Sequence, residues 1–191
     1  MKYAADTSVS VMKTRSEIED LVTRAGASRF FSGSDEGRAF VGFTMKCNER
    51  ACPDCTPPKP GGATLKSRWE CDLCSKTGKV QDLRNVMFEL PLPKPELFRL
   101  DGRRRPRTVE KQHDAWEQGC RSSWRALFLA IKAKLVSVAS GVESFEEAFL
   151  AQIVVPAEAG GSERFGKRAV KAIAESYVSN GPPRLMLGSG S

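Results

Sequence analysis

The chain has 191 residues, of which 40% are hydrophobic, and thirty Lys and Arg against 23 Asp and Glu give a formal net charge of +7. This length and apolar fraction suit a protein with one core and a small appendage, or with two small domains. They exclude an intrinsically disordered chain, which would be too polar to bury a core. The positive charge favours polyanionic partners but names none, because an ordinary solvated basic surface has the same composition.

The cysteines and the apolar runs indicate the compartment. Residues 1–11 contain no run typical of a signal peptide, and nowhere do about 18 apolar residues follow one another, so neither export nor a membrane partner is expected. Four of the six cysteines have metal-type spacing, which fits a reducing compartment better than a disulfide scaffold. We therefore expect a cytoplasmic protein.

The first predicted elements are a short strand and a helix. Residues 9–12 alternate as in a strand, and Thr14 with Glu17 has the spacing of a capping box that starts a helix. Gly26 stands where a left-handed C-cap is expected. The apolar face of this helix recurs at helical spacing and consists of Ile18, Leu21, Val22 and Ala25.

Three β-rich runs follow. Arg29–Phe31 and Ala39–Met45 flank the glycine-bearing stretch Ser32–Gly37, which predicts a hairpin. Val86–Leu90 is another strand candidate, stopped by prolines. The cysteine-rich stretch at about 47–79 therefore lies between two predicted strands, as an insertion projecting from an antiparallel sheet.

This stretch contains two Cys-x-x-Cys knuckles, Cys52/Cys55 and Cys71/Cys74, separated by fifteen residues. Two thiolates three positions apart on a tight turn can face one ion, and two such turns complete the tetrahedron that zinc prefers. Four ligands saturate the ion, so one structural zinc without a reactive water is expected. Cys47 is left over, as an alternative ligand if Cys52 does not bind. Residues 47–74 resemble a zinc ribbon, a module found in many nucleic-acid-handling proteins and, elsewhere, used only as a staple.

Basic and aromatic residues stand between the knuckles: Lys66, Arg68 and Trp69. Ribbons can present such a surface to the backbone and bases of a nucleic acid. Alternatively, Trp69 packs over the zinc loops as their miniature core.

Residues 99–108 form the predicted boundary between segments 1–98 and 109–184. Five arginines, a glycine and a proline within nine residues predict an exposed, mobile loop. Guanidinium groups bind phosphate oxygens bidentately, which makes this loop the best candidate for phosphate contact; a solvated linker is the alternative. The candidate contacts are Arg103, Arg104, Arg105 and Arg107.

A long helix is predicted at about Glu110–Ser140. Its apolar residues fall within about 100° of arc, the width of a core-facing stripe; they are Trp116, Cys120, Trp124, Leu127, Ile131, Leu135 and Val138. Arg121, Arg125 and Lys132 cluster on another face, either as a basic ridge continuing the arginine loop or as an ordinary solvated face.

Two shorter helices complete the helical half. Ser144 with Glu147 predicts a capping box for a helix at 144–154, and a last helix is expected at 162–179, before a flexible tail at 185–191. The residues expected to face inward are Phe145, Ala148, Phe149 and Ile153 in the first, and Phe165, Ala169, Ile173 and Tyr177 in the second.

Catalysis has little support in the sequence. His113 is the single histidine, no phosphate-binding glycine loop or nucleophile elbow occurs, and no small-molecule substrate is evident. Scattered acidic residues could assemble a magnesium site only if the fold brought them together. A non-enzymatic protein is therefore favoured over an enzyme.

Segments Thr14–Ala27 and Trp124–Val154 resemble uncharacterised proteins encoded by bacteriophages and prophages, which implies an intracellular role in viral or mobile-element biology, in a bacterial host. Together these features predict an α+β protein, with a small antiparallel sheet, a zinc-ribbon insertion and a helical C-terminal half. The expected function is non-enzymatic nucleic-acid binding through basic residues. The alternative is a protein-interaction, assembly or inhibitor module in which the ribbon is a rigid docking element.

Overall fold

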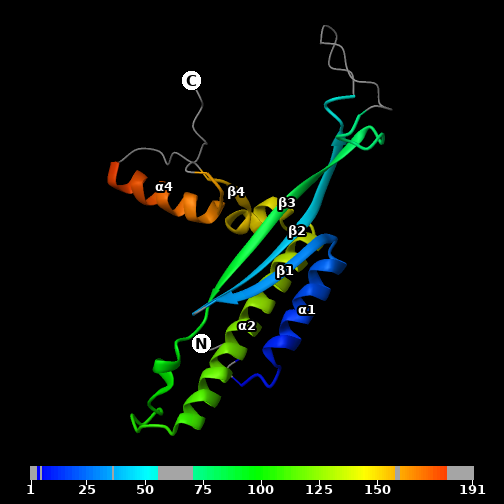
Figure 1. Cartoon of the computed structure of the whole chain (residues 1–191). Coiled ribbons are helices and arrows are strands. Elements are labelled where there is room, and N and C mark those ends of the chain that lie inside the picture. Colours follow the sequence, from blue (N-terminus) through cyan, green and yellow to red (C-terminus); the bar gives the residue numbers. More distant parts are fainter. Residues whose placement is uncertain (1–3, 5, 36, 56–70, 158–159, 180–191) are drawn as a thin grey trace.

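The computed structural model describes the chain except residues 1–3, 5, 36, 56–70, 158–159 and 180–191. It is an α+β protein, as predicted, with a three-stranded antiparallel sheet of order β1-β2-β3 and a long helix in the second half (Figure 1). The elements of the first half are α1 (Val11–Arg24), β1 (Ala27–Asp35), β2 (Arg38–Ala51) and β3 (Lys79–Pro91). Those of the second half are the 3₁₀ turn η2 (Pro95–Phe98), α2 (Val109–Ala139), α3 (Phe145–Phe149), the 3₁₀ turn η3 (Leu150–Gln152), β4 (Val154–Pro156), β5 (Ser162–Arg164) and α4 (Phe165–Ser179).

Helix α1 begins earlier than the sequence predicts. Ser10 is its N-cap, and its Oγ accepts a hydrogen bond from the backbone N–H of Lys13 at 3.2 Å. Thr14 is fully buried in the first turn, where its hydroxyl donates to the Ser10 carbonyl at 3.1 Å. The predicted strand at 9–12 and the capping box at Thr14 were therefore wrong. The helix already begins at Val11, because the Ser10 side chain caps its first turn. The expected helix end is confirmed at Gly26, whose φ is +101°.

The sheet is longer than the β-rich runs indicate. β1 pairs with β2 from Ala27↔Met45 to Asp35↔Arg38, so the predicted hairpin is present but its turn is shorter than Ser32–Gly37. Gly33 belongs to a strand, opposite Phe40. β2 pairs with β3 from Arg38↔Pro91 to Ala51↔Lys79, and these two strands continue beyond the helices as a long two-stranded arm (Figure 1).

The core lies between one face of the sheet and helices α1 and α2. Phe43 and Phe149 are fully buried, with ring centroids 5.9 Å apart in an edge-to-face arrangement. The predicted stripe of α2 is confirmed by its buried residues, which are Cys120, Trp124, Leu127, Ile131 and Leu135. Trp116 is half-buried, and its indole N–H donates to the Pro93 carbonyl at 2.8 Å.

The capping box at Ser144 and Glu147 is confirmed, but the helix that it starts is short. After Phe149 the chain makes a 3₁₀ turn, and Ile153 forms a β-bridge with Val86 instead of continuing the predicted helix. Residues 162–164 likewise pair with β4, so the last helix starts only at Phe165.

Helix α4 projects from the body of the protein (Figure 1). Ala172 is its buried residue, whereas Ile173 and Tyr177 are 43% and 82% exposed, so the expected inward stripe was wrong for these two. The cause is that, among the described residues, α4 packs chiefly against the short segment 150–164, which covers a narrow strip of its surface. The predicted tail at 185–191 lies outside the described residues. Among the helices that the structure describes, none is long and apolar enough to cross a membrane.

Candidate metal centre

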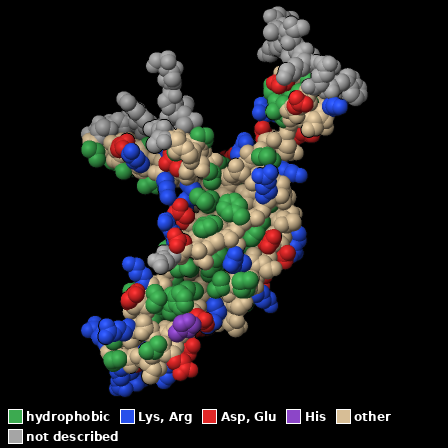
Figure 2. All heavy atoms as spheres, viewed as in Figure 1, with side chains coloured by type: hydrophobic (Ala, Val, Ile, Leu, Met, Phe, Trp, Pro, Cys, Tyr) green, Lys and Arg blue, Asp and Glu red, His purple; other side chains and the backbone are tan. Residues whose placement is uncertain are grey.

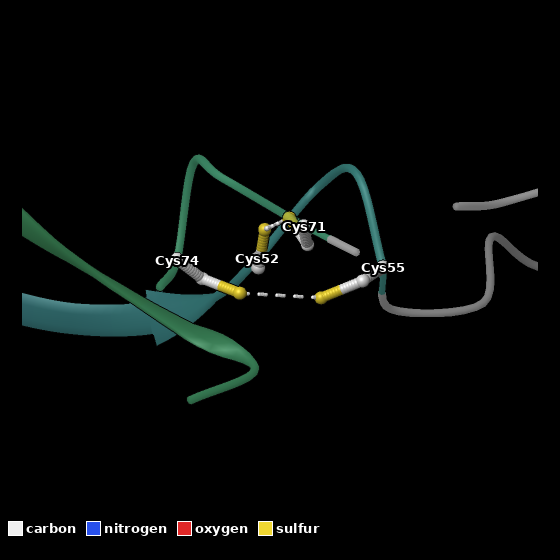
Figure 3. Close-up of side chains that lie close together, drawn as sticks. All are labelled: Cys52, Cys55, Cys71 and Cys74. Atoms are coloured by element: carbon white, nitrogen blue, oxygen red, sulfur yellow. Dashed lines mark hydrogen bonds between the residues drawn. The ribbon is translucent and has the colours of Figure 1, made fainter. Parts of the chain in front are cut away.

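The four cysteines of the two knuckles meet at the tip of the β2–β3 arm. Pairing of Ala51 with Lys79 holds the two chain segments together directly below them. Cys52 and Cys55 leave β2, and Cys71 and Cys74 precede β3, so the side chains converge from two segments (Figure 3). We call this group the four-cysteine cluster.

The spacing of the sulfur atoms fits one four-coordinate ion. The Cys52 and Cys71 Sγ atoms are 3.6 Å apart, those of Cys55 and Cys74 are 3.5 Å apart, and all four lie within 4.8 Å of one another. Four sulfurs at about 2.3 Å from a tetrahedral zinc lie about 3.8 Å from each other. The donor set and its geometry are therefore consistent with a pair of zinc knuckles.

The backbone after Cys74 is folded around its sulfur. Ser75, Lys76 and Gly78 all have positive φ, and this turn brings the Gly78 N–H to 3.3 Å from Cys74 Sγ. The Gly78 carbonyl accepts from Cys52 N–H at 3.0 Å, which ties one knuckle to the other. The spacing of the cysteines does not predict this role of Gly78. The sequence signal for it is a glycine four residues after the last cysteine of the cluster.

Burial and hydrogen bonding oppose each other at Cys74 but act together at Cys55. Cys52, Cys71 and Cys74 are buried, with exposed fractions of 5% or less. Burial opposes ionisation of Cys74, but the Gly78 N–H and the neighbouring sulfurs lower its pKa to about 7. Burial and the hydrogen bond with Cys74 raise the pKa of Cys55 to about 12. Several thiolates so close together repel one another, and a bound cation relieves that repulsion.

The other two cysteines lie elsewhere. Cys47 is half-buried on β2 and packs against the main core, and Cys52 occupies the cluster position for which Cys47 was the alternative. Burial raises the pKa of both Cys47 and Cys120. Cys120 is buried on α2, as expected for a small hydrophobic side chain of the core-facing stripe. Among the described residues, the four-cysteine cluster is the one group of three or more His, Cys, Asp or Glu side chains placed to hold a metal.

The predicted basic and aromatic surface between the knuckles, Lys66, Arg68 and Trp69, lies outside the described residues.

The arginine loop is a hydrogen-bonded turn. Asp101 Oδ1 accepts from the backbone N–H groups of Arg103 and Arg105, both at 2.8 Å, and Leu100 forms a β-bridge with Pro106. Arg103, Arg104 and Arg105 are exposed, and their guanidinium groups have no partner among the described residues. Arg107 differs, because its guanidinium donates to the carbonyls of Phe98 and Leu100 at 3.0 and 2.6 Å.

The predicted basic ridge on α2 is largely engaged in internal contacts. Arg125 pairs with Glu17 of α1 and lies 4.3 Å from the centre of the Phe128 ring. Arg121 contacts Glu117 at 3.4 Å, whereas Lys132 is exposed with no partner in the described part of the chain.

The four-cysteine cluster and the arginine loop lie at opposite ends of the molecule, separated by the sheet and by α2 (Figure 1). Lys and Arg side chains gather at the arginine-loop end (Figure 2). One short ligand therefore cannot contact both.

The fold and site define an α+β protein with a projecting four-cysteine arm. The chain matches no protein-family model, and no curated protein or solved structure is significantly similar to it.

Proposed function

We propose that this protein binds nucleic acid without catalysis, and that one structural zinc in the four-cysteine cluster rigidifies its arm. The chemistry of the cluster supports zinc, because its four cysteine sulfur atoms lie within 4.8 Å of one another and four thiolates are a preferred ligand set of structural zinc. Cys52, Cys55, Cys71 and Cys74 would hold the ion, and this full set of protein ligands makes the site structural.

The observation that carries nucleic-acid binding is the arginine turn. Asp101 fixes the backbone at Arg103 and Arg105 through two hydrogen bonds, while the guanidinium groups of residues 103–105 extend into solvent. Unpaired guanidinium groups on an ordered turn can bind phosphates at a lower entropic cost than the same groups on a mobile loop. The net charge of +7 acts in the same direction.

The test is a fluorescence-anisotropy titration with labelled single-stranded and duplex DNA and RNA at several salt concentrations. Micromolar or tighter binding with a clear salt slope supports the proposal. Replacing two turn arginines in R103S/R105S should lower the slope by about 1.4 to 1.8, since each phosphate contact contributes about 0.7 in single strands and 0.9 in duplexes. The matched control R24S/K171S removes the same charge elsewhere and should leave the slope nearly unchanged.

A protein-docking module is the second candidate, and helix α4 favours it. Its exposed apolar residues recur at helical spacing on one face, as in helices that dock into a groove; they are Val170, Ile173, Tyr177 and Val178. No binding to any nucleic acid at low salt, together with salt-independent capture of one protein through α4, would replace the first proposal with this one.

A further inference from the structure

The three-stranded sheet has a core face and an open face. Successive residues of a strand point to opposite faces, so Val41 and Phe43 enter the core while Phe40 and Gly42 lie on the other side. Helices α1 and α2 pack on the core face. On the opposite face Phe31 is 49% and Phe40 36% exposed, so these two rings are open to solvent in the described structure.

Each of these rings lies over a glycine of the neighbouring strand. Phe31 is opposite Gly42, and Phe40 is opposite Gly33. A Cβ atom on Gly42 would lie 2.0 Å from Phe31 Cζ, and one on Gly33 would lie 2.3 Å from Phe40 Cζ, so both rings rest against backbone. Their centroids are 6.4 Å apart. The glycines therefore allow two neighbouring aromatic rings to lie along the sheet surface.

Cations flank the two rings on the same face. In the register of β1 and β2, Arg29 lies one row beyond Phe31, and Arg38 lies one row beyond Phe40. Lys46 continues this face along β2. None of these three cations forms a salt bridge with a described residue, whereas Glu89 on the same face is already paired with two cations of the C-terminal segment. Asp35, opposite Arg38, is a second carboxylate on the described part of this face.

The surface is hollowed beside Phe40. A cavity of about 190 Å³ is lined by Arg38, Phe40, Met87 and Glu89, together with Asp35 and Ala39. Its lining combines the apolar side chain of Met87, the aromatic ring of Phe40, the guanidinium group of Arg38 and carboxylates that can accept hydrogen bonds. A nucleic-acid base suits this lining, because it has a flat apolar face and hydrogen-bonding groups along its edge.

We propose that this open face binds single-stranded nucleic acid, with bases stacked on Phe31 and Phe40 and phosphates held by Arg29, Arg38 and Lys46. The inference rests on the proposed function. It adds that the bound nucleic acid is single-stranded and that the sheet forms a second contact surface besides the arginine turn. Unstacked bases expose the flat faces that aromatic side chains bind, whereas a duplex hides them. A second copy of the chain fits less well, because two-fold pairing through this face would bring together two surfaces that both carry the cations Arg29, Arg38 and Lys46.

The test separates base stacking from phosphate contact. The probes are labelled oligothymidine and an abasic oligonucleotide of the same length and charge. We expect the wild-type protein to bind oligothymidine more tightly, by roughly 5-fold to 150-fold for each stacked base. The F31L/F40L variant keeps apolar cover over the glycines but loses the aromatic faces, so it should bind both probes equally, with its affinity for the abasic probe unchanged.

Two further variants keep this result interpretable. F31Y/F40Y retains both rings and should retain the preference for bases. Y177L removes an exposed aromatic ring from α4 and should behave like the wild type. Thermal melts of all variants should agree within a few degrees. If F31L/F40L does not fold, the single substitution F31L replaces it, because Phe31 is more exposed than Phe40.

Each contrary result has a distinct meaning. Equal wild-type affinity for both probes, with a clear salt slope, would overturn the stacking surface and leave the proposed function standing. Binding of neither probe, while a duplex still binds with a clear salt slope, would overturn this inference and leave the proposed function standing. Binding of no nucleic acid at all at low salt would remove both. An unchanged preference in F31L/F40L would also overturn the inference, as would a wild-type dimer that the leucine substitutions dissociate without changing oligonucleotide affinity.

Discussion

Arg164 at the end of β5 donates a hydrogen bond of 2.9 Å to Glu89 of β3, 75 positions earlier in the chain. Lys167, in the first turn of α4, donates to the other oxygen of the same carboxylate at 3.1 Å. These contacts join the C-terminal segment to the sheet. Because α4 packs chiefly on the short segment before it, the two hydrogen bonds to Glu89 contribute to holding this helix against the sheet.

Acid should therefore loosen the C-terminal segment. The hydrogen bond from Lys167, with the charge of Arg164, lowers the pKa of Glu89 below its ordinary value of 4.5. A carboxyl whose pKa is lower in the folded state stabilises the fold fully above that ordinary value, and the stabilisation is lost as the pH falls through the folded pKa. We expect α4 amides to exchange faster with solvent as the pH falls progressively below 4.5. The pH-corrected exchange of core amides in α2 should change much less.

The variant Glu89→Gln should reproduce that loosening at neutral pH. Glu89 and its two partners are partly exposed, so the local stability of the C-terminal segment should fall by about 0.2 to 1 kcal/mol. Hydrogen exchange measured by mass spectrometry resolves it. An E89Q variant whose α4 exchange keeps the acid dependence of the wild type would show that another group controls the segment.

Metal content should depend on the knuckle cysteines and not on the other two. Protein purified without added zinc should contain close to one zinc per chain, and C71S/C74S should contain almost none, because two remaining thiolates cannot complete the tetrahedron. The matched control Cys47→Ser removes a half-buried thiol on β2, the strand that leads into the cluster, and should keep its zinc. Elemental analysis gives both numbers; a fully folded wild-type protein without metal contradicts the zinc assignment.

Removing the metal should disorder the arm and spare the core. Cys52, Cys71 and Cys74 pack with Cys55 and Val80 in a small cluster separate from the main hydrophobic core. After chelation we expect faster amide exchange in the last residues of β2 and the first residues of β3, which lie next to the cluster. The unfolding midpoint of the core should change little. Loss of the whole cooperative transition on chelation would show that the zinc supports the entire fold.

Phe149 should be among the most costly core positions. Its ring is fully buried, meets Phe43 and Phe88 edge-to-face at 5.9 and 6.2 Å, and stacks on Phe145 at 4.6 Å. Replacement by alanine should reduce the free energy of unfolding by about 3 to 5 kcal/mol. In the same urea titration, Tyr177→Ala, at a position 82% exposed, should change it by no more than about 0.5 kcal/mol.

Asp101 should limit the affinity of the arginine turn for phosphate. Asparagine at this position keeps an oxygen that can accept the two backbone hydrogen bonds, but removes a negative charge next to the guanidinium groups. If the turn contacts phosphates, Asp101→Asn should therefore tighten nucleic-acid binding by about 2-fold to 5-fold at low salt, and less at high salt. Asp101→Ala loses the hydrogen bonds as well and should bind more weakly than D101N. Equal affinities of D101N and the wild type at low salt would argue against phosphate contact at this turn.

The sequence by itself determined the elements whose signals are local. Cysteine spacing identified the four cysteines that the structure brings together, because two short turns meeting at one point specify their own geometry. The apolar period of α2 and the capping box at Ser144 also depend only on near neighbours. The N-terminus of α1 was misplaced because Ser10 and Thr14 both have side chains able to cap, and only the burial of Thr14 distinguishes them.

Only the tertiary structure decided which residues share a surface. It placed the arginine turn far from the four-cysteine cluster, engaged Arg107 and Arg125 in internal contacts, and left Ile173 and Tyr177 exposed on α4. It also put Phe31 and Phe40 on the open face of the sheet. Strand alternation separates Phe40 from Val41, but it does not say which face the helices cover. That depends on contacts between residues far apart in the chain, which local patterns do not contain.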